Sequence, residues 1–172
     1  GEANALVVKK PYLGRSYQSK KLVSSIIWEG IPGTLILALA AITFATVVGI
    51  LLGTIAGLKK DTIWDTSAIM MSVLGVSTPS FFAGLLIAYI FGYALQDYTG
   101  LSMTGSLRSF DTDGNAYFDL KNLILPTLTL GIRPLAIIAQ LTRSALLDTL
   151  HQDYIRTAYA KGLSKSQVVK RH

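Results

Sequence analysis

Long uncharged runs dominate the pattern of polar and apolar positions along the chain. No charged side chain occurs in the 28 residues from Ile31 to Leu58 or in the 31 residues from Thr66 to Gln96. A third apolar stretch, Leu123 to Leu147, contains only two charges, Arg133 and Arg143. A helix needs about 20 apolar residues to cross a bilayer. The pattern therefore predicts three membrane-crossing helices, at about 32–58, 66–95 and 123–147.

Composition supports a membrane protein. Of the 172 residues, 51% are apolar and 15% are charged, whereas a soluble domain has about 25% charged residues. The net charge of +6 is explained by lysines and arginines that flank the spans, so we expect a lipid bilayer and no nucleic acid as partner. The chain has no cysteine, two histidines and no recognisable catalytic or nucleotide-binding motif. We therefore expect no catalytic residue, metal or cofactor, and any ATP must be bound by another chain.

Small residues form a regular stripe in the first predicted span. They recur at every fourth position and so share one helix face: Ala41, Ala45, Gly49, Gly53 and Gly57. In lipid, such a stripe lets another backbone approach closely. Glycine and alanine are also common in membrane helices for no specific reason, but five in register favour helix packing, against a partner in this chain or in another.

The second and third spans contain residues that indicate a polar pathway. Pro79 cannot donate a backbone hydrogen bond and should kink its helix, and Ser77 can bond a freed carbonyl. Arg133 lies about 15 Å into the third span, where a charge costs roughly 2.5–3.5 kcal/mol on insertion scales. Ser77, Pro79 and Arg133 are thus a candidate translocation path. The alternatives are a kink that serves only packing and an arginine that reaches the membrane surface.

One polar loop has a weak likeness to a calcium site. Asp111, Asp113 and Asn115 match the first positions of a calcium-binding loop. Ala116 and Asn122 stand where that loop needs glycine and glutamate. A turn-rich surface loop is therefore favoured over a metal site.

The tail predicts two short helices joined by a glycine. Asp153 can cap the first helix, and Gly162 suits the left-handed residue that ends it. Ser164 and Gln167 form a capping box for the second helix. We expect Tyr154, Ile155, Ala158 and Tyr159 to form the buried face of the first helix. Such a basic, amphipathic element either lies on anionic lipid or docks onto a soluble partner.

The tail resembles a known motif. Arg156-Thr157-Ala158, followed by Gly162, resembles the E-A-A-x-x-x-G loop of permease subunits in binding-protein-dependent ABC importers. The flanking residues are similar to the oligopeptide/dipeptide branch of that family. Further matches follow in order along the chain, at Leu13–Tyr17, Pro32–Leu35, Ser77–Phe81, Leu125–Gly131, Leu141–Ser144 and Asp153–Ser164. Two residues depart from the family pattern, namely Arg156 in place of glutamate and Arg133 in place of a small or apolar residue.

The resemblance implies an all-α membrane protein, here a piece of a six-span permease that lacks its first span and its last two. The glycine at position 1 and the helical pattern that still runs at His172 also indicate a piece of a longer protein. Residues 1–31 would be an extracytoplasmic lead-in, 32–147 the transmembrane region and 148–172 a truncated cytoplasmic coupling loop. Lysines and arginines are equally frequent on the two sides, so this orientation rests on the resemblance. The implied ATPase-coupling residues are Asp153, Tyr154, Ile155, Arg156, Thr157, Ala158, Tyr159 and Gly162.

The resemblance further implies a transporter rather than an enzyme, a permease subunit in a bacterial or archaeal plasma membrane that imports peptides or similar small solutes. Its implied partners are a second permease subunit, two ATP-binding cassette ATPase subunits and an extracytoplasmic substrate-binding protein. The alternative is a structural or channel subunit of a membrane complex without an ATPase partner. The cargo stays open among dipeptides, oligopeptides, glutathione, a nickel complex and a sugar.

Overall fold

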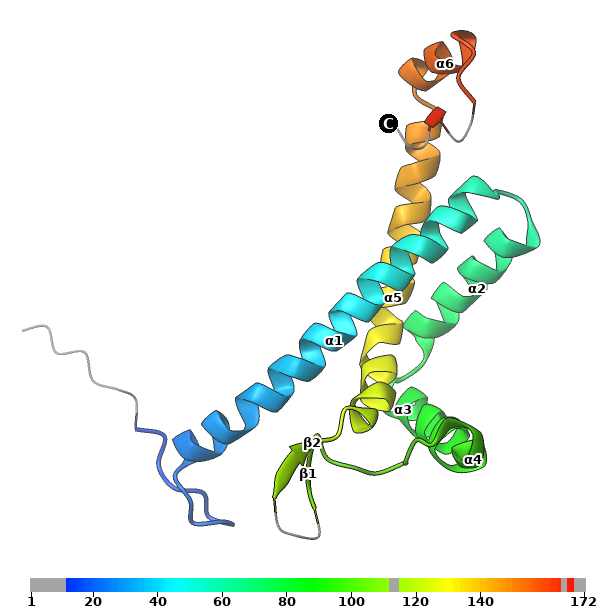
Figure 1. The fold of residues 1–172 in the computed structure, drawn as a ribbon. Helices are drawn as coiled ribbons and strands as arrows, with labels where there is room; N and C mark the ends of the chain where they lie inside the picture. Colours follow the sequence, from blue (N-terminus) through cyan, green and yellow to red (C-terminus); the bar gives the residue numbers. More distant parts are fainter. Residues whose placement is uncertain (1–11, 112–114, 165–166, 169–172) are drawn as a thin grey trace, which may run out of the picture. The chain divides into compact units, whose positions relative to one another are not determined.

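The computed structural model describes residues 12–111, 115–164 and 167–168. The chain divides into two compact units, residues 1–36 and 37–172. Helices make up most of the described residues, with one small hairpin (Figure 1). The elements, in order, are α1 (Val23–Leu58), α2 (Ile63–Ser77), α3 (Ser80–Tyr89), the π-helical turn η1 (Ile90–Ala94), α4 (Gln96–Thr99), β1 (Arg108–Phe110), β2 (Ala116–Phe118), α5 (Lys121–Leu150) and α6 (Asp153–Ala160).

The first unit contains a closed loop and the beginning of α1. Arg15 and Leu22 form an isolated antiparallel bridge, and the Val23 N–H donates to the Gly14 carbonyl over 3.1 Å. That bond satisfies one of the N–H groups that a helix leaves unpaired at its start. The helix therefore begins at Val23, nine residues before the predicted start of the span, and Pro32 lies inside it.

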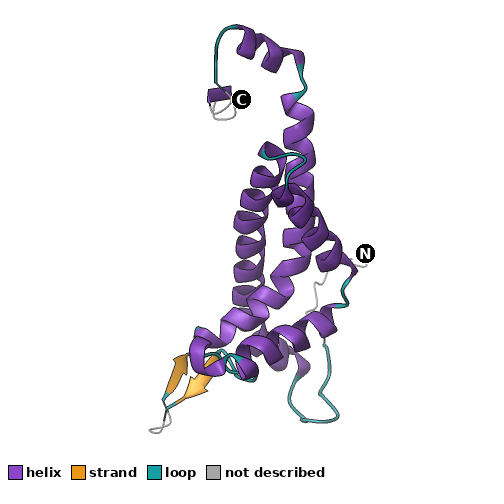
Figure 2. Ribbon diagram, turned by 90° about the vertical axis from the view of Figure 1, so that its right-hand side faces the viewer, coloured by secondary structure: helices purple, strands orange, loops and turns teal. Residues whose placement is uncertain are grey.

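In the second unit, α5 lies against the C-terminal half of α1 (Figures 1 and 2). Glycines mark the places where the two helices touch. Going along both helices, the facing groups are Ala41 and Phe44 with Gly131, Gly49 with Leu135 and Ile138, Gly53 with Ala139 and Thr142, and Gly57 with Leu146. Because the contacts advance in the same direction along both helices, this part of α1 runs parallel to α5.

The segment from α2 to the hairpin follows α5 in the opposite direction. The successive contacts are Asp65 with Arg143, Gly75 with Ala136 and Ile132, Gly84 with Thr129, and Gly105 with Asn122. The 21 residues between Arg143 and Asn122 correspond to about 32 Å of helix, which is close to the roughly 30 Å thickness of a hydrocarbon core. The segment therefore crosses from one end of α5 to the other.

The crossing is broken at Pro79, and the break is sharper than the predicted kink. The helix pair before and after it is bent by 112°. Thr78 and Pro79 both have extended backbones, with ψ of 129° and 132°. For Thr78 this follows from the proline after it, because a proline disfavours the helical conformation of the residue that precedes it. The Thr78 hydroxyl donates to the Leu74 carbonyl over 2.6 Å, which satisfies part of the exposed end of α2.

The helix α5 begins earlier than the sequence predicted. The Asp119 carboxylate accepts the Lys121 N–H over 3.1 Å, so the first turn forms there and Pro126 lies deeper in the helix. Before α5, β1 and β2 pair antiparallel, with Arg108 opposite Phe118. The tip of this hairpin, which includes Asp113 of the calcium-like run, lies outside the described residues.

By length and composition, α1 and α5 can each cross a membrane, and the bent pair of α2 with α3 and η1 makes a third crossing if it forms one span. Apolar side chains on these helices are largely exposed, for example Leu39, Leu51 and Leu85. Such a surface suits lipid or further membrane helices. The predicted fold class, a helical membrane protein, is confirmed. The hairpin of three residues per strand is an addition that the sequence analysis did not foresee.

Candidate functional site

The helix α6 follows α5 after a two-residue link, at the end of α5 opposite the hairpin (Figure 1). Gln152 has the extended backbone of an N-cap residue, and Asp153 is the first helical residue. The prediction of Asp153 as the cap is wrong. Its carboxylate lies 3.8 Å from the Arg156 guanidinium instead. The negative charge of Asp153 still interacts favourably with the positive, N-terminal end of the helix dipole.

The end of α6 is a Schellman motif. Gly162 has a φ of +85°, the left-handed conformation that its position after the helix predicts. The Gly162 N–H donates to the Tyr159 carbonyl over 2.9 Å, and the Leu163 N–H donates to the Ala158 carbonyl over 3.3 Å. Both bonds define this motif. It turns the chain back along α6.

The returning chain closes a small apolar core. Ile155 and Ala158 are buried together with Val168, and Leu150 and Leu163 pack against them. The predicted capping box is confirmed, because the Ser164 N–H donates to Gln167 Oε1 over 2.9 Å and the Gln167 N–H donates to Ser164 Oγ over 3.4 Å. The helix-glycine-helix element therefore has its own folded shape.

The expected buried face of α6 is correct for two of its four residues. Ile155 and Ala158 are covered by this chain itself, whereas Tyr154 and Tyr159 are 51% and 41% exposed. Arg156 and Thr157 are exposed as well. A partner that docks on α6 would therefore meet aromatic and polar side chains rather than Ile155 and Ala158.

The other predicted residues fall in two places. All five small residues of the α1 stripe, Ala41, Ala45, Gly49, Gly53 and Gly57, are buried. Ser77 and Pro79 are exposed at the bend, and Arg133 is exposed near the middle of α5. Gln140 lies two turns from Arg133 and is exposed too. Among the described residues, no hydrogen bond or ion pair joins Arg133 to Ser77 or Pro79.

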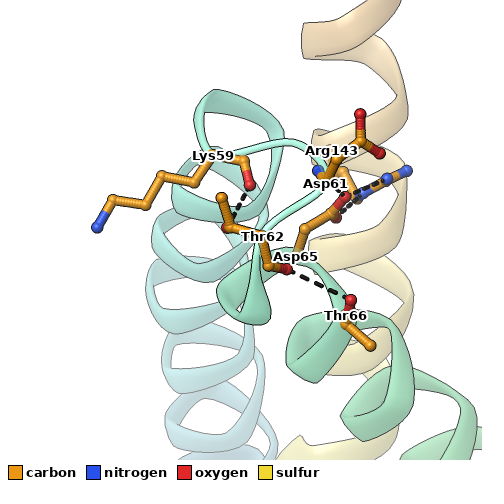
Figure 3. Close-up of polar contacts among 6 residues, drawn as sticks. All are labelled: Lys59, Asp61, Thr62, Asp65, Thr66 and Arg143. Atoms are coloured by element: carbon orange, nitrogen blue, oxygen red, sulfur yellow. Dashed lines mark hydrogen bonds and ion pairs between the residues drawn. The ribbon is translucent and has the colours of Figure 1, made fainter.

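The structure also contains an ion pair that the sequence analysis missed. Figure 3 shows the Asp65 carboxylate, in the first turn of α2, against the Arg143 guanidinium of α5. Arg143 Nη2 donates to Asp65 Oδ2 over 2.8 Å, and Nε donates to Oδ1. The Asp61 N–H donates to Oδ2 as well, over 3.1 Å. Only 5% of the Asp65 side chain is exposed, against 23% of Arg143, and removing one partner from a buried pair costs about 3–5 kcal/mol.

The Asp65–Arg143 pair could have been predicted from the order of the membrane crossings along the chain. Asp65 immediately precedes the second uncharged run and lies four residues after the charged turn Lys59–Asp61, and Arg143 lies near the end of the third run. With three crossings, both residues fall at the same side of the membrane. Opposite charges at the same depth on neighbouring helices are expected to pair, because an unpaired charge there is costly.

Two helices long enough to cross a membrane, α1 and α5, together with the bent pair that packs on α5 and a folded helical element at one end, define a multi-span helical membrane protein. A comparison with known families assigns the class more closely. Residues 49–172 match the binding-protein-dependent transport system inner membrane component family. Since this match covers most of the chain, the chain belongs to that family.

Known relatives come from peptide transport systems. The di/tripeptide transport system permease protein DppB of Pseudomonas aeruginosa is 38% identical over 93% of this chain and 52% of its own length. The dipeptide transport system permease protein DppB of Bacillus subtilis is 35% identical over 87% of this chain and 44% of its own length. The chain thus spans about half the length of the curated relatives that it matches.

Proposed function

We propose that the chain is part of a permease subunit of an ATP-driven importer of peptides or similar small solutes, in a bacterial or archaeal plasma membrane. A second permease subunit completes the pathway, two ATPase subunits bind on the cytoplasmic side, and an extracytoplasmic binding protein delivers the cargo. Family membership and the identity to dipeptide permeases over most of the chain support this proposal.

The observation that carries the proposal is the folded element at the end of α5. A soluble ATPase can drive transport only if its movement reaches the membrane helices through a rigid contact. The helix α6 suits this role because its own core, with Ile155 and Val168, and the turn at Gly162 fix its shape. Its exposed side presents Tyr154 and Tyr159, and tyrosine is enriched at protein interfaces.

The proposal also includes a translocation path for the cargo at the middle of the membrane. The break at Pro79 leaves Ser77 exposed, and broken helices line the binding sites of many transporters. Arg133 lies about 15 Å from Arg143 along α5, so it belongs at mid-membrane, where a charge faces a wet cavity or a polar partner. Ser77, Pro79 and Arg133 would then line the path.

A reconstituted complex tests both statements. The full-length subunit, purified with its partners and placed in vesicles, should take up labelled peptides only with ATP and the binding protein. Arg133→Leu should assemble normally and change the uptake rate or the preference among peptides, by roughly 10- to 100-fold for a lost charged contact of about 1.5–3 kcal/mol. A subunit that co-purifies with no ATPase would favour a structural or channel component instead. An unchanged cargo profile in Arg133→Leu would remove Arg133 from the path.

The orientation is open to a direct measurement. We propose that residues 1–31 and the β1–β2 hairpin lie outside, and that the α1–α2 turn and residues 148–172 lie inside the cell. The chain has no cysteine, so single cysteines report cleanly. Lys60→Cys, in an exposed turn, should react with a membrane-impermeant thiol reagent only after permeabilisation, and Asn115→Cys should react in intact cells. The reverse pattern would contradict the orientation and the role of α6.

A further inference from the structure

The pair of Asp65 and Arg143 joins two elements that the proposed function treats separately. Arg143 lies seven residues before the end of α5, about two helical turns from the link to α6. Asp65 lies in the first turn of α2, the helix that ends at the break before Pro79. The pair thus connects the helix that carries α6 to the helix that enters the bend.

The form of the contact suits the transfer of a movement. Two parallel bonds between a guanidinium and a carboxylate fix orientation as well as distance. The Asp61 N–H, which also donates to Asp65, holds the α1–α2 turn to the same carboxylate (Figure 3). A shift of α5 at Arg143 therefore displaces the start of α2 and the turn together.

A small cavity interrupts the packing at this level of the helices. A cavity of about 120 Å³ lies between α1, α2 and α5, lined by Ala56, Ala68, Ile69, Ser72, Ala139, Gln140 and Arg143. A void deprives its lining of dispersion contacts. Further along α2, Gly75 packs closely on α5, where a β-carbon would lie 3.1 Å from that of Ala136. Near the cytoplasmic end, the ion pair is a direct polar connection between α2 and α5.

We propose that Asp65 and Arg143 are positioning residues that transmit the movement of α6 to the broken span. The pair makes α2 follow α5, so that displacement of α6 by the ATPases changes the bend at Thr78 and Pro79. This inference rests on the proposed function and deepens it. Neither residue touches cargo or nucleotide in this scheme. The pair instead affects how much cargo is transported for each ATP hydrolysed.

The test compares two changes in the full-length complex reconstituted in vesicles. Asp65→Leu combined with Arg143→Met replaces the pair by apolar side chains, an exchange that is often neutral or stabilising in a buried site. Arg143→Lys keeps the charge but loses the two-bond geometry. Both should assemble and hydrolyse ATP within about twofold of the wild-type rate, while peptide uptake per ATP falls about tenfold, the size of a typical coupling between sites. Glu29→Gln removes the exposed contact of Glu29 with Lys21 and should change neither rate.

The measured uptake per ATP of these variants either supports or contradicts the role of the Asp65–Arg143 pair. Wild-type uptake per ATP in the Leu/Met variant would mean that the pair serves stability alone, and the inference would fall. If that variant does not assemble, Arg143→Lys decides, because a wild-type ratio there would equally overturn the proposal. Loss of uptake and hydrolysis in strict proportion would also count against it. Absence of ATP-driven uptake in the wild-type complex would instead refute the proposed function itself.

Discussion

Replacing Gly162 by valine should abolish the stimulation of ATP hydrolysis by the loaded binding protein, while the membrane helices stay inserted. Gly162 has a φ of +85°, a conformation that a β-branched residue adopts very rarely. Strain of this kind costs about 1–3 kcal/mol. Relieving it would open the turn, separate Val168 from Ile155 and Ala158, and remove the fixed shape of α6. The measurement is ATP hydrolysis by the reconstituted full-length complex, with and without binding protein and peptide.

Two controls isolate the backbone as the cause. A β-carbon at Gly162 would meet nothing within 4 Å, so size alone is harmless there. Gly162→Asn should therefore retain most of the stimulation, since asparagine tolerates the left-handed region. Gly100 has a φ of +63° and similar free space, so Gly100→Val imposes comparable strain on the other side of the membrane and should leave stimulation largely intact. Full stimulation in Gly162→Val would contradict the coupling role of α6.

Replacing Gly53 by leucine should prevent assembly of the complex. A β-carbon at Gly53 would lie 2.4 Å from the Ala139 carbonyl oxygen and 2.7 Å from Thr142 Cβ. The first of these is backbone and cannot rotate away, so the helices α1 and α5 must separate. Overpacking typically costs about 1–3 kcal/mol, and here it also breaks contacts along the neighbouring turns. The yield of intact complex after detergent extraction measures the effect.

A graded series sharpens this prediction. Gly53→Ala should already lower the yield, because the clash begins at the β-carbon. Ile50→Leu lies one turn away on an exposed position and keeps the side-chain volume, so it should give nearly the wild-type yield. Equal yields for Gly53→Leu and Ile50→Leu would mean that the contact between α1 and α5 contributes little to the assembled subunit.

The order of apolar, polar and special residue types along the chain was sufficient to predict the features that depend on local sequence. The uncharged runs predict membrane helices, because an apolar run long enough to span a bilayer is typical of them, and α1 and α5 are long and apolar enough to cross a membrane. The Gly162 turn and the capping box of Ser164 and Gln167 follow from residue types with strong conformational preferences. The ends of the helices were less predictable. The Asp119 carboxylate starts α5 upstream of the apolar run, and the Gly14 carbonyl does the same for α1.

The features that the sequence did not reveal depend on contacts between distant residues. Asp65 and Arg143 are 78 residues apart, and no local pattern links them. The burial of Ile155 and Ala158 by this chain, rather than by a partner, depends on the return of Val168. Pro79 indicated a disturbance in the second span, but the angle of 112° depends on how α3 packs on α5.

The position of Asp65 has a consequence for biosynthesis. Asp65 leaves the ribosome 78 residues before Arg143, which at 5–20 residues per second is a delay of roughly 4–16 s. During that time α1 and α2 enter the membrane and the carboxylate has no arginine to pair with. Lys59, Lys60 and Asp61 lie four to six residues before it, and these charges hold the turn at the aqueous surface. Water can therefore solvate the carboxylate until α5 arrives, and the insertion machinery never has to place an uncompensated charge in hydrocarbon.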